Sequence, residues 1–322
     1  MGLNQSFQGL SKLNYLLIVK SSSLFIITCL VYFVLIMEKV QTGQVIEFYS
    51  NSCLVKTSLG EFSCMAIKNI VVGDYVELEI IKDSKKILGK ITKINNRFSS
   101  LSKRYGNKDK LFAANITHVG IISTSIPKTS SEFLDKWILK SRLSKIEPFI
   151  INNKIDIESE DAYREKLKIY EDIGIHIINT SAKYSDNIEE LINYLKNKCV
   201  LFVGNSGAGK STLSSKIIGK KLKTNNLSKN QGMHTTSISS LYEVESNIKI
   251  IDSPGMRDIE LTDYKPDQII YGFEEILDAS KDCKFNDCNH INNDGCMVIT
   301  KLANGEISKS RYNNFLKFRD KK

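Results

Sequence analysis

A glycine-rich run at residues 204–212 has the residue types and the spacing that hold the phosphates of a nucleotide. Its glycines let backbone N–H groups curl around phosphate oxygens at the start of a helix. Lys210 would bring a positive charge to the β- and γ-phosphates, and the Ser211 hydroxyl would ligate Mg²⁺. An apolar strand precedes the run and a helical stretch follows it, as a phosphate loop requires. The expected loop comprises Gly204, Asn205, Ser206, Gly207, Ala208, Gly209, Lys210, Ser211 and Thr212.

Two later segments could complete a site for Mg²⁺ and the γ-phosphate. The strand expected over residues 248–251 is followed by Asp252, whose carboxylate can hold Mg²⁺ directly or through water. The N–H of Gly255 can approach the γ-phosphate because no Cβ obstructs it. Ahead of this strand, a Gly-Met-His-Thr-Thr run supplies hydroxyls for a switch loop, in which either Thr235 or Thr236 would be the Mg²⁺ ligand.

Another pair of motifs could read the base. Residues 153–156 are Asn-Lys-Ile-Asp at the end of an expected strand. The Asp156 carboxylate can accept two hydrogen bonds from the N1–H and N2–H₂ groups of guanine, a donor pair that adenine lacks, so the motif selects GTP over ATP. Residues 179–183, Asn-Thr-Ser-Ala-Lys, also end a strand and can add backbone contacts. The expected base-contacting residues are Asn153, Lys154, Ile155, Asp156, Ser181, Ala182 and Lys183.

Three of the seven cysteines crowd together with a histidine near the C-terminus: Cys283, Cys288, His290 and Cys296. Three thiolates and one imidazole complete a tetrahedral Zn²⁺ shell with no open position, so the spacing predicts a structural zinc site. The surrounding segment is polar, and metal binding would supply folding energy that apolar burial cannot. The alternative is a set of unrelated buried thiols beside a surface histidine.

The elements that must position these motifs fall into two patterns. Five short strands are expected at residues 43–49, 53–57, 61–67, 74–81 and 86–95, which suits a small closed barrel, either an OB-fold or an SH3-like barrel. Residues 93–110 are basic and are expected to be a linker or a phosphate-contacting loop. Strands expected at 118–123, 148–152, 175–179, 200–203 and 248–251, with helices at 132–143 and 187–198, indicate a parallel α/β sheet.

The order of the motifs is unusual, because Asp156 precedes Gly204. In ordinary GTPases the phosphate loop comes first and the base-reading motif last. The same sheet results if the old termini are joined and the chain is cut elsewhere, which is a circular permutation. The fold class expected is therefore multidomain: an N-terminal β-barrel (OB-fold), a central circularly permuted α/β P-loop GTPase, and a C-terminal, mostly helical zinc-binding domain.

This combination of motifs (NKID, TSAK, GNSGAGKST, GMHTTS and DSPGM in that order, then the cysteine cluster) resembles the circularly permuted, ribosome small-subunit-dependent GTPases called RsgA or YjeQ. The resemblance covers about residues 40–320. It implies an OB-fold and a zinc domain flanking the GTPase, late maturation of the small ribosomal subunit, and hydrolysis of GTP when bound to it. The implied partners are the subunit, its rRNA and GTP/GDP, and a cytoplasmic monomer is expected.

The resemblance also bears on the attacking water. Met256 follows the Asp-Ser-Pro-Gly turn, and its thioether cannot orient water as a glutamine does. His234, beside the switch threonines, is the candidate for that role, and the family pattern favours Thr236 as the threonine ligand. The alternative is a histidine that only supports the switch loop.

Length and composition bound these interpretations. The chain has 322 residues, 42% of them hydrophobic and 25% charged, which excludes a disordered chain, a collagen-like fibre and a polytopic membrane protein. A net charge of +9 suits a polyanionic partner, and the odd, dispersed cysteines indicate a reducing compartment. The domains expected are a leader at 1–36, a barrel at 37–105, the GTPase at 106–275 and the zinc domain at 276–322.

The leader is apolar and has no Asp or Glu before residue 38. Its continuous apolar stretch is short for a membrane span. The first interpretation is that the true start is Met37 and that the leader is translated upstream sequence. The second is a membrane-associated extension, and the third is a cleaved signal peptide. The alternative functions are a membrane-tethered regulatory GTPase with a protein partner, and a binding module whose nucleotide site only switches conformation.

Overall fold

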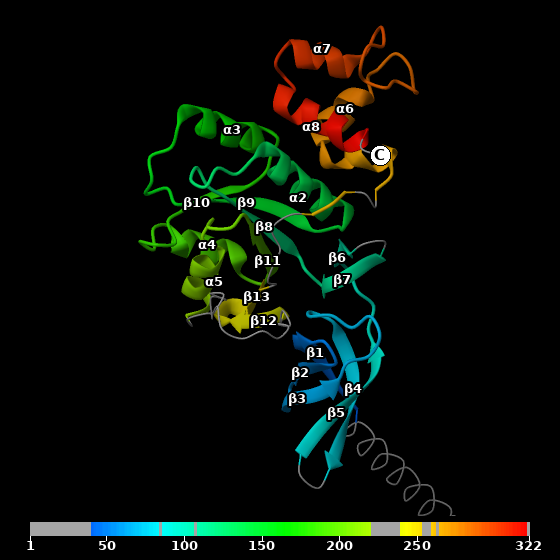
Figure 1. Cartoon of the computed structure of the whole chain (residues 1–322), viewed down its shortest axis with the longest axis vertical. Coiled ribbons are helices and arrows are strands. Elements are labelled where there is room, and N and C mark those ends of the chain that lie inside the picture. Colours follow the sequence, from blue (N-terminus) through cyan, green and yellow to red (C-terminus); the bar gives the residue numbers. More distant parts are fainter. Residues whose placement is uncertain are drawn as a thin grey trace, which may run out of the picture.

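The computed structural model describes residues 40–83, 86–105, 108–219, 239–252, 259–261 and 264–320 (Figure 1). The expected leader lies outside these residues. Among the helices that are described, none combines the length and the apolar character needed to cross a membrane.

The N-terminal part is a closed five-stranded barrel, as the OB-fold expectation required. Its strands pair in the cyclic order β1-β2-β3-β5-β4 and back to β1, with β3 and β5 parallel and the other pairs antiparallel. Side chains that alternate along the strands, such as Val45, Val55 and Leu78, are buried in its interior. The strands are β1 (Val40–Tyr49), β2 (Ser52–Thr57), β3 (Gly60–Met65), β4 (Tyr75–Asp83) and β5 (Lys86–Ile94).

The basic stretch after the barrel is not the loop that its polarity indicated. It continues into an antiparallel hairpin of β6 (Ser100–Tyr105) and β7 (Lys108–Ala114). Leu101, Ala113 and Ala114 from this hairpin are fully buried, so apolar anchors at one end fix two strands whose other end is basic. The expectation of a linker was wrong here because it was read from charge alone.

The central part is a sheet with helices on both faces. Five strands are parallel in the order β10-β9-β8-β11-β13, and β12 adds an antiparallel edge. One hydrophobic cluster joins the sheet to α2 and α3, and a second joins its other face to α4 and α5. The strands are β8 (His118–Ser123), β9 (Glu147–Asn153), β10 (Ile177–Thr180), β11 (Cys199–Gly204), β12 (Ser239–Val244) and β13 (Ile248–Asp252); the helices are α2 (Ser131–Leu143), α3 (Asp161–Asp172), α4 (Ile188–Leu195) and α5 (Lys210–Ile218).

The barrel and the central sheet are continuous. Strand β1 pairs with β12 through the partners Glu47–Ser240 and Phe48–Ser239, so one backbone ladder crosses from the barrel into the α/β sheet. Strand β12 was not expected from the sequence. It supplies the connection because, among the described strands of the α/β sheet, only β13 pairs with it, which leaves its other edge for β1.

The C-terminal part is helical and packs above α2 (Figure 1). It contains the 3-10 helix η2 (Pro266–Gly272) and the helices α6 (Glu274–Ser280), α7 (Met297–Ala303) and α8 (Lys309–Arg319). The mostly helical character expected of this region is thus confirmed.

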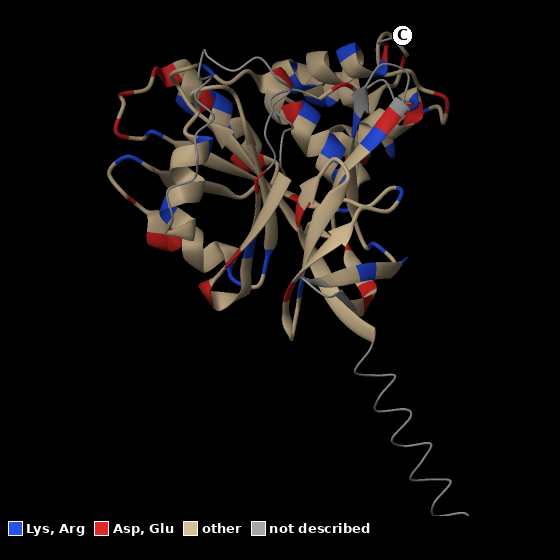
Figure 2. Cartoon of the chain, turned by 60° about the horizontal axis from the view of Figure 1, so that its bottom comes forward, with Lys and Arg blue, Asp and Glu red and all other residues tan. Residues whose placement is uncertain are grey.

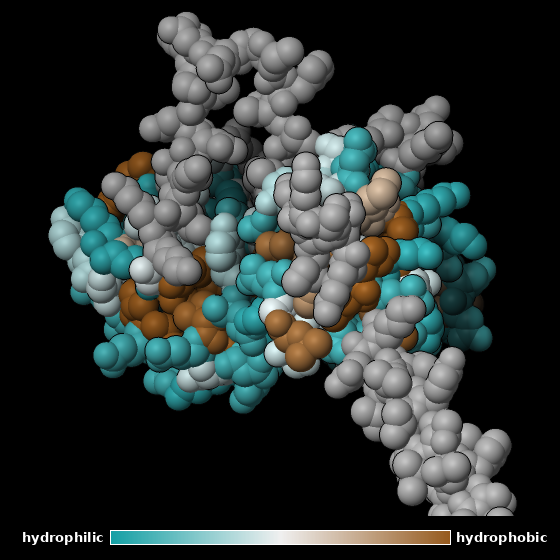
Figure 3. Space-filling model, turned by 90° about the horizontal axis from the view of Figure 1, so that it is seen from below, coloured by the Kyte–Doolittle hydropathy of each residue, from teal (hydrophilic) through white to brown (hydrophobic). Residues whose placement is uncertain are grey.

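Charged and apolar groups are both dispersed over the described surface. Basic and acidic residues are interspersed along the ribbon in this view (Figure 2). On the lower face, hydrophobic side chains form separate areas with hydrophilic residues between them (Figure 3). Several basic residues counted as a free surplus in the sequence pair with acids from other segments: Lys93 with Glu77, Arg97 with Asp74, and Lys317 with Glu132.

Candidate functional site

The phosphate-loop residues connect β11 to α5, as expected. Gly207 and Gly209 have φ angles of 77° and 94°, a conformation that side chains with a Cβ rarely adopt. The ammonium of Lys210 turns back over the loop and donates to the carbonyl of Gly204 at 3.1 Å. Helix α5 begins at Lys210, so its unpaired N–H groups and positive dipole end face the space that the loop encloses.

Asn153 ties the base-reading motif to the phosphate loop. Its side chain is 2% exposed; Nδ2 donates to the carbonyl of Ala208 at 2.8 Å, and Oδ1 accepts from the N–H of Ala182 at 3.0 Å. A Cβ on Gly209 would lie 2.3 Å from this Nδ2. Three motifs far apart in the sequence therefore converge on one buried amide.

The remaining base-reading residues lie beside it at the carboxyl ends of β9 and β10. Lys154 has a φ of 67°, and its ammonium donates to the carbonyl of Ile126 at 3.0 Å. The Ser181 hydroxyl donates to the Asp156 carboxylate. This hydrogen bond orients the carboxylate that is expected to accept from guanine. Ile155 and Lys183 remain exposed at the rim.

Asp252 ends β13 and is largely buried. Burial raises the pKa of its carboxyl, and the nearby charge of Lys210 acts in the opposite direction. An acid held in such a place favours a cation partner, which is the requirement of a Mg²⁺ shell. Three further expected residues, His234, Thr236 and Gly255, lie outside the described residues, as does Met256.

A loop that sequence reasoning missed closes one side of the site. Residues 124–130 follow β8 and contain a cis peptide bond before Pro127. A Cβ on Gly207 would lie 3.7 Å from the Pro127 ring, and the Lys166 ammonium of α3 donates to the carbonyl of Thr129 at 2.5 Å. A signal was present, since Pro127 is one of only four prolines and stands four residues after the end of an expected strand.

The four expected zinc ligands come together in the C-terminal region. Their ligand atoms all lie within 4.8 Å of one another. The Nδ1 atom of His290 is 3.7 Å from the Sγ atoms of Cys283 and Cys296, and those two Sγ atoms are 4.0 Å apart. A tetrahedral zinc ion would place such S–N and S–S pairs about 3.6 and 3.8 Å apart. The cluster therefore has the donor set and the spacing to hold a zinc ion.

The backbone around this cluster is shaped to present the ligands. His290 has a φ of 57°, and its carbonyl accepts from the Tyr312 hydroxyl at 2.6 Å. Gly295 has a φ of 72°, and a Cβ there would meet Lys284 at 2.9 Å. The turn before Cys296 thus depends on glycine, and α8 holds the histidine segment in place.

Comparison with known proteins gives the family that the motifs resemble. The family model of the RsgA GTPase matches residues 94–262. The small ribosomal subunit biogenesis GTPase RsgA of Flavobacterium psychrophilum is 34% identical over 278 residues, covering 82% of this chain and 84% of that protein. The crystal structure of YjeQ from Thermotoga maritima has a TM-score of 0.69 and 29% identity, covering 87% of this chain and 97% of that one.

A second solved structure supports the permuted topology. The structure of YloQ, described as a circularly permuted GTPase, has a TM-score of 0.66 at 24% identity and covers 87% of this chain. This likeness concerns the fold alone. The family model matches more than half of this chain, and the Flavobacterium psychrophilum relative is 34% identical over 82% of it. The chain therefore belongs to the RsgA GTPase family and is a GTP hydrolase.

Proposed function

We propose that this chain binds the small ribosomal subunit through rRNA, assists its late maturation, and hydrolyses GTP to GDP and phosphate when the subunit activates it. The relatives are named as small ribosomal subunit biogenesis GTPases, which supports ribosome biogenesis as the process. The cytoplasm is the compartment that this proposal implies, and a monomer is the simplest form of the protein consistent with it.

The observation that carries the proposal is the backbone ladder between β1 and β12. A barrel of the OB type commonly binds oligonucleotides. Here it pairs with the strand that begins at Ser239, only a few residues after the expected switch threonines. Contact between RNA and the barrel could therefore alter the strand that leads directly out of the switch loop.

Within the nucleotide site each residue has a proposed role. Lys210 and the backbone N–H groups of the phosphate loop hold the phosphates, and Asp156 selects guanine. Ser211, Thr236 and Asp252 hold Mg²⁺, directly or through water. The Gly255 N–H contacts the γ-phosphate, and His234 positions the attacking water. The ion in the cysteine cluster is zinc with a structural role, because no ligand position remains open.

GTP turnover with and without purified small subunits tests the proposal. Stimulation by the subunits is expected, together with co-sedimentation of the protein with them. Turnover that small subunits leave unchanged, or protein that remains off the subunits in every nucleotide state, would contradict it.

The water-positioning role of His234 is tested in the same assay. His234→Ala should lower the stimulated turnover by about a hundredfold, while GTP affinity stays within about twofold, because the residue acts in the transition state rather than in binding. Gln231→Ala, in the same segment, is the matched control. Unchanged stimulated turnover in His234→Ala would assign the histidine a supporting role in the loop.

A further inference from the structure

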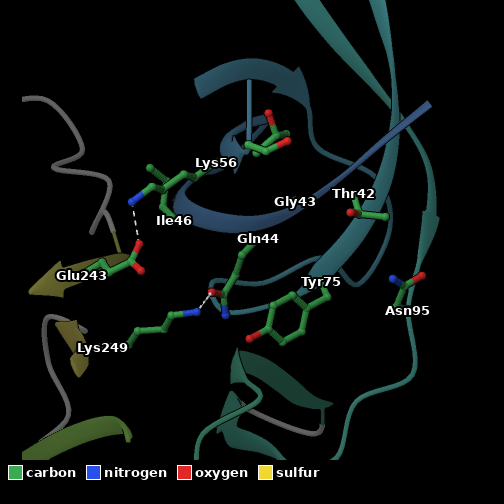
Figure 4. Close-up of a pocket in the computed structure, with 11 residues that line it drawn as sticks. Thr42, Gly43, Gln44, Ile46, Lys56, Tyr75, Asn95, Glu243 and Lys249 are labelled. Atoms are coloured by element: carbon green, nitrogen blue, oxygen red, sulfur yellow. Dashed lines mark hydrogen bonds and ion pairs between the residues drawn. The ribbon is translucent and has the colours of Figure 1, made fainter. Parts of the chain in front are cut away.

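A polar pocket of about 460 Å³ lies between the barrel and the α/β sheet (Figure 4). Strands β1, β2 and β4 form one side of it, and β12 and β13 supply side chains from the other. Its volume is in the range of pockets that hold small ligands. None of the residues expected to bind GTP lines it.

The side chains that line the pocket carry a net positive charge. The Lys56 ammonium pairs with the Glu243 carboxylate across the junction. The Lys249 ammonium instead donates to the neutral amide oxygen of Gln44 at 2.7 Å. Two lysines and one carboxylate among the lining residues leave one positive charge for an anionic ligand.

An aromatic face is available beside this charge. The Tyr75 side chain points into the pocket in Figure 4, is 39% exposed, and has the Lys249 ammonium 5.7 Å from its ring centroid. A flat, half-exposed ring next to a cation is the arrangement on which proteins stack the bases of single-stranded nucleic acids.

A polar amide also lines the pocket beside this ring. Asn95 follows β5, and its N–H donates to the carbonyl of Tyr75 at 2.8 Å, so the two residues are neighbours. The edge of a nucleobase carries polar groups that can contact such an amide.

From these contacts we propose that the pocket binds one unstacked nucleotide of a single-stranded RNA. The base packs on Tyr75, its edge lies against the Asn95 amide, and its phosphate contacts Lys249. An inorganic anion would make no stacking contact with the Tyr75 ring and would not need the Asn95 amide. An apolar ligand would leave the Lys249 charge without an anionic partner. The inference rests on the proposed function, since it gives part of the RNA partner a place on this chain.

An occupied pocket would act on the nucleotide site through two strands. Glu243 and Lys249 are cross-strand partners on β12 and β13. Strand β13 ends three residues later at Asp252, and β12 begins just after the switch segment. A phosphate that attracts Lys249 therefore acts on the strand pair that carries the expected Mg²⁺ ligand.

The test measures the affinity of the full-length, GDP-saturated protein for a short fluorescent single-stranded RNA. Tyr75→Ala should weaken binding by about tenfold or more, whereas Tyr75→Phe should retain it. Lys249→Gln should weaken binding and reduce the slope of log affinity against log salt by about one. Tyr271→Ala removes another exposed tyrosine, on η2 and outside the pocket, and is the matched control. Unchanged GDP binding by each variant shows that it is folded.

Two further measurements distinguish RNA from a free nucleotide as the ligand, and distinguish failure of the pocket inference from failure of the proposed function. Uridine monophosphate that binds as tightly as the RNA, with the same loss in Tyr75→Ala, would make the ligand a free nucleotide and overturn the RNA assignment. Wild-type affinity for RNA in Tyr75→Ala and Asn95→Ala, with the protein still co-sedimenting with small subunits, would overturn the pocket inference and leave the proposed function standing. Absence of wild-type co-sedimentation would contradict the proposed function itself.

Discussion

At the scale of single residues, Gly209 is held against the buried amide of Asn153. A Cβ at Gly209 would lie 2.3 Å from Nδ2, and this amide cannot move away without breaking its hydrogen bonds to Ala208 and Ala182. We predict that Gly209→Ala weakens GDP binding by at least about tenfold, because the loop or the base-reading motif must shift. Titration with a fluorescent GDP analogue measures the change.

Gly219 provides the control for this prediction. It also has a positive φ, of 67°, but a Cβ there would meet nothing within 4 Å. Gly219→Ala therefore introduces only backbone strain, of about 1 kcal/mol, and should leave GDP affinity unchanged. Equal losses in the two variants would show that backbone strain, rather than contact with Asn153, is responsible.

His118 makes a pH-dependent contribution to stability. Burial, helped by the charge of Lys198, lowers its pKa from 6.5 to about 4. As the pH falls below 6.5, the unfolded chain takes up this proton before the folded chain does, so stability is lost between about pH 6.5 and pH 4. We predict that the melting temperature of His118→Gln falls less over this interval than that of the wild type. His118 meets the ring of Tyr194 edge-on, and His176→Gln, which alters an exposed histidine stacked on that ring, is the matched control. Parallel melting profiles for the wild type and His118→Gln would contradict the assignment.

Candidate site residues could be named from the sequence where the chemistry is local. The phosphate loop, the Asn-Lys-Ile-Asp motif and the cysteine cluster each lie within one short segment, so their spacing alone indicated them. The role of Asn153 as a bridge between motifs could not be predicted, because it depends on carbonyl and N–H groups 55 and 29 residues away. For the same reason, counting charges in the sequence could not show that Arg97 and Lys317 pair with carboxylates from other segments.

At the scale of elements, strands with clear apolar character were located within a few residues. Strand β8 was predicted with its observed bounds, and the alternation of Val76, Leu78 and Ile80 identified β4. The hairpin of β6 and β7 and the edge strand β12 were missed because polar residues interrupt their apolar pattern. They form strands because their neighbours in the fold supply hydrogen-bonding partners, which a local pattern does not report.

The same hairpin bears on the domain boundaries, which remain a proposal. The boundary placed after residue 105 falls between β6 and β7, which pair with each other. Residue Asn115, just after β7, donates through its side chain to the carbonyl of Gly73 in the barrel at 2.9 Å. We therefore propose that the barrel unit extends to about residue 115 and that the GTPase unit begins with β8.

The cysteine cluster determines whether the C-terminal elements keep their arrangement. Cys288→Ser removes one of four ligands, and we predict that zinc bound to the purified protein falls from one ion per chain to well below one. The helices α6 and α7, which flank the cluster, should become sensitive to protease, while GDP binding is retained. Cys199→Ala, at a buried cysteine outside the cluster, should keep its zinc. Elemental analysis of the purified proteins measures the bound zinc. A wild-type protein that is folded but holds no zinc would contradict the assignment of the cluster as a zinc site.

At the scale of the whole molecule, Arg311 joins the C-terminal part to the α/β sheet. It is fully buried, and its guanidinium pairs with Asp135 of α2 at 2.6 Å and with Glu275 of α6 at 2.7 Å. Removing it leaves Asp135 buried without its cation, at a cost of about 3–5 kcal/mol. We therefore predict that Arg311→Met loosens the contact between α8 and α2, seen as faster hydrogen exchange across residues 274–319 with nearly unchanged GDP affinity. Lys317→Gln breaks the other ion pair between the same helices, at a half-exposed position worth less than about 1 kcal/mol, and should exchange like the wild type. If both variants exchanged alike, the buried pair would not be what fixes the C-terminal part in place.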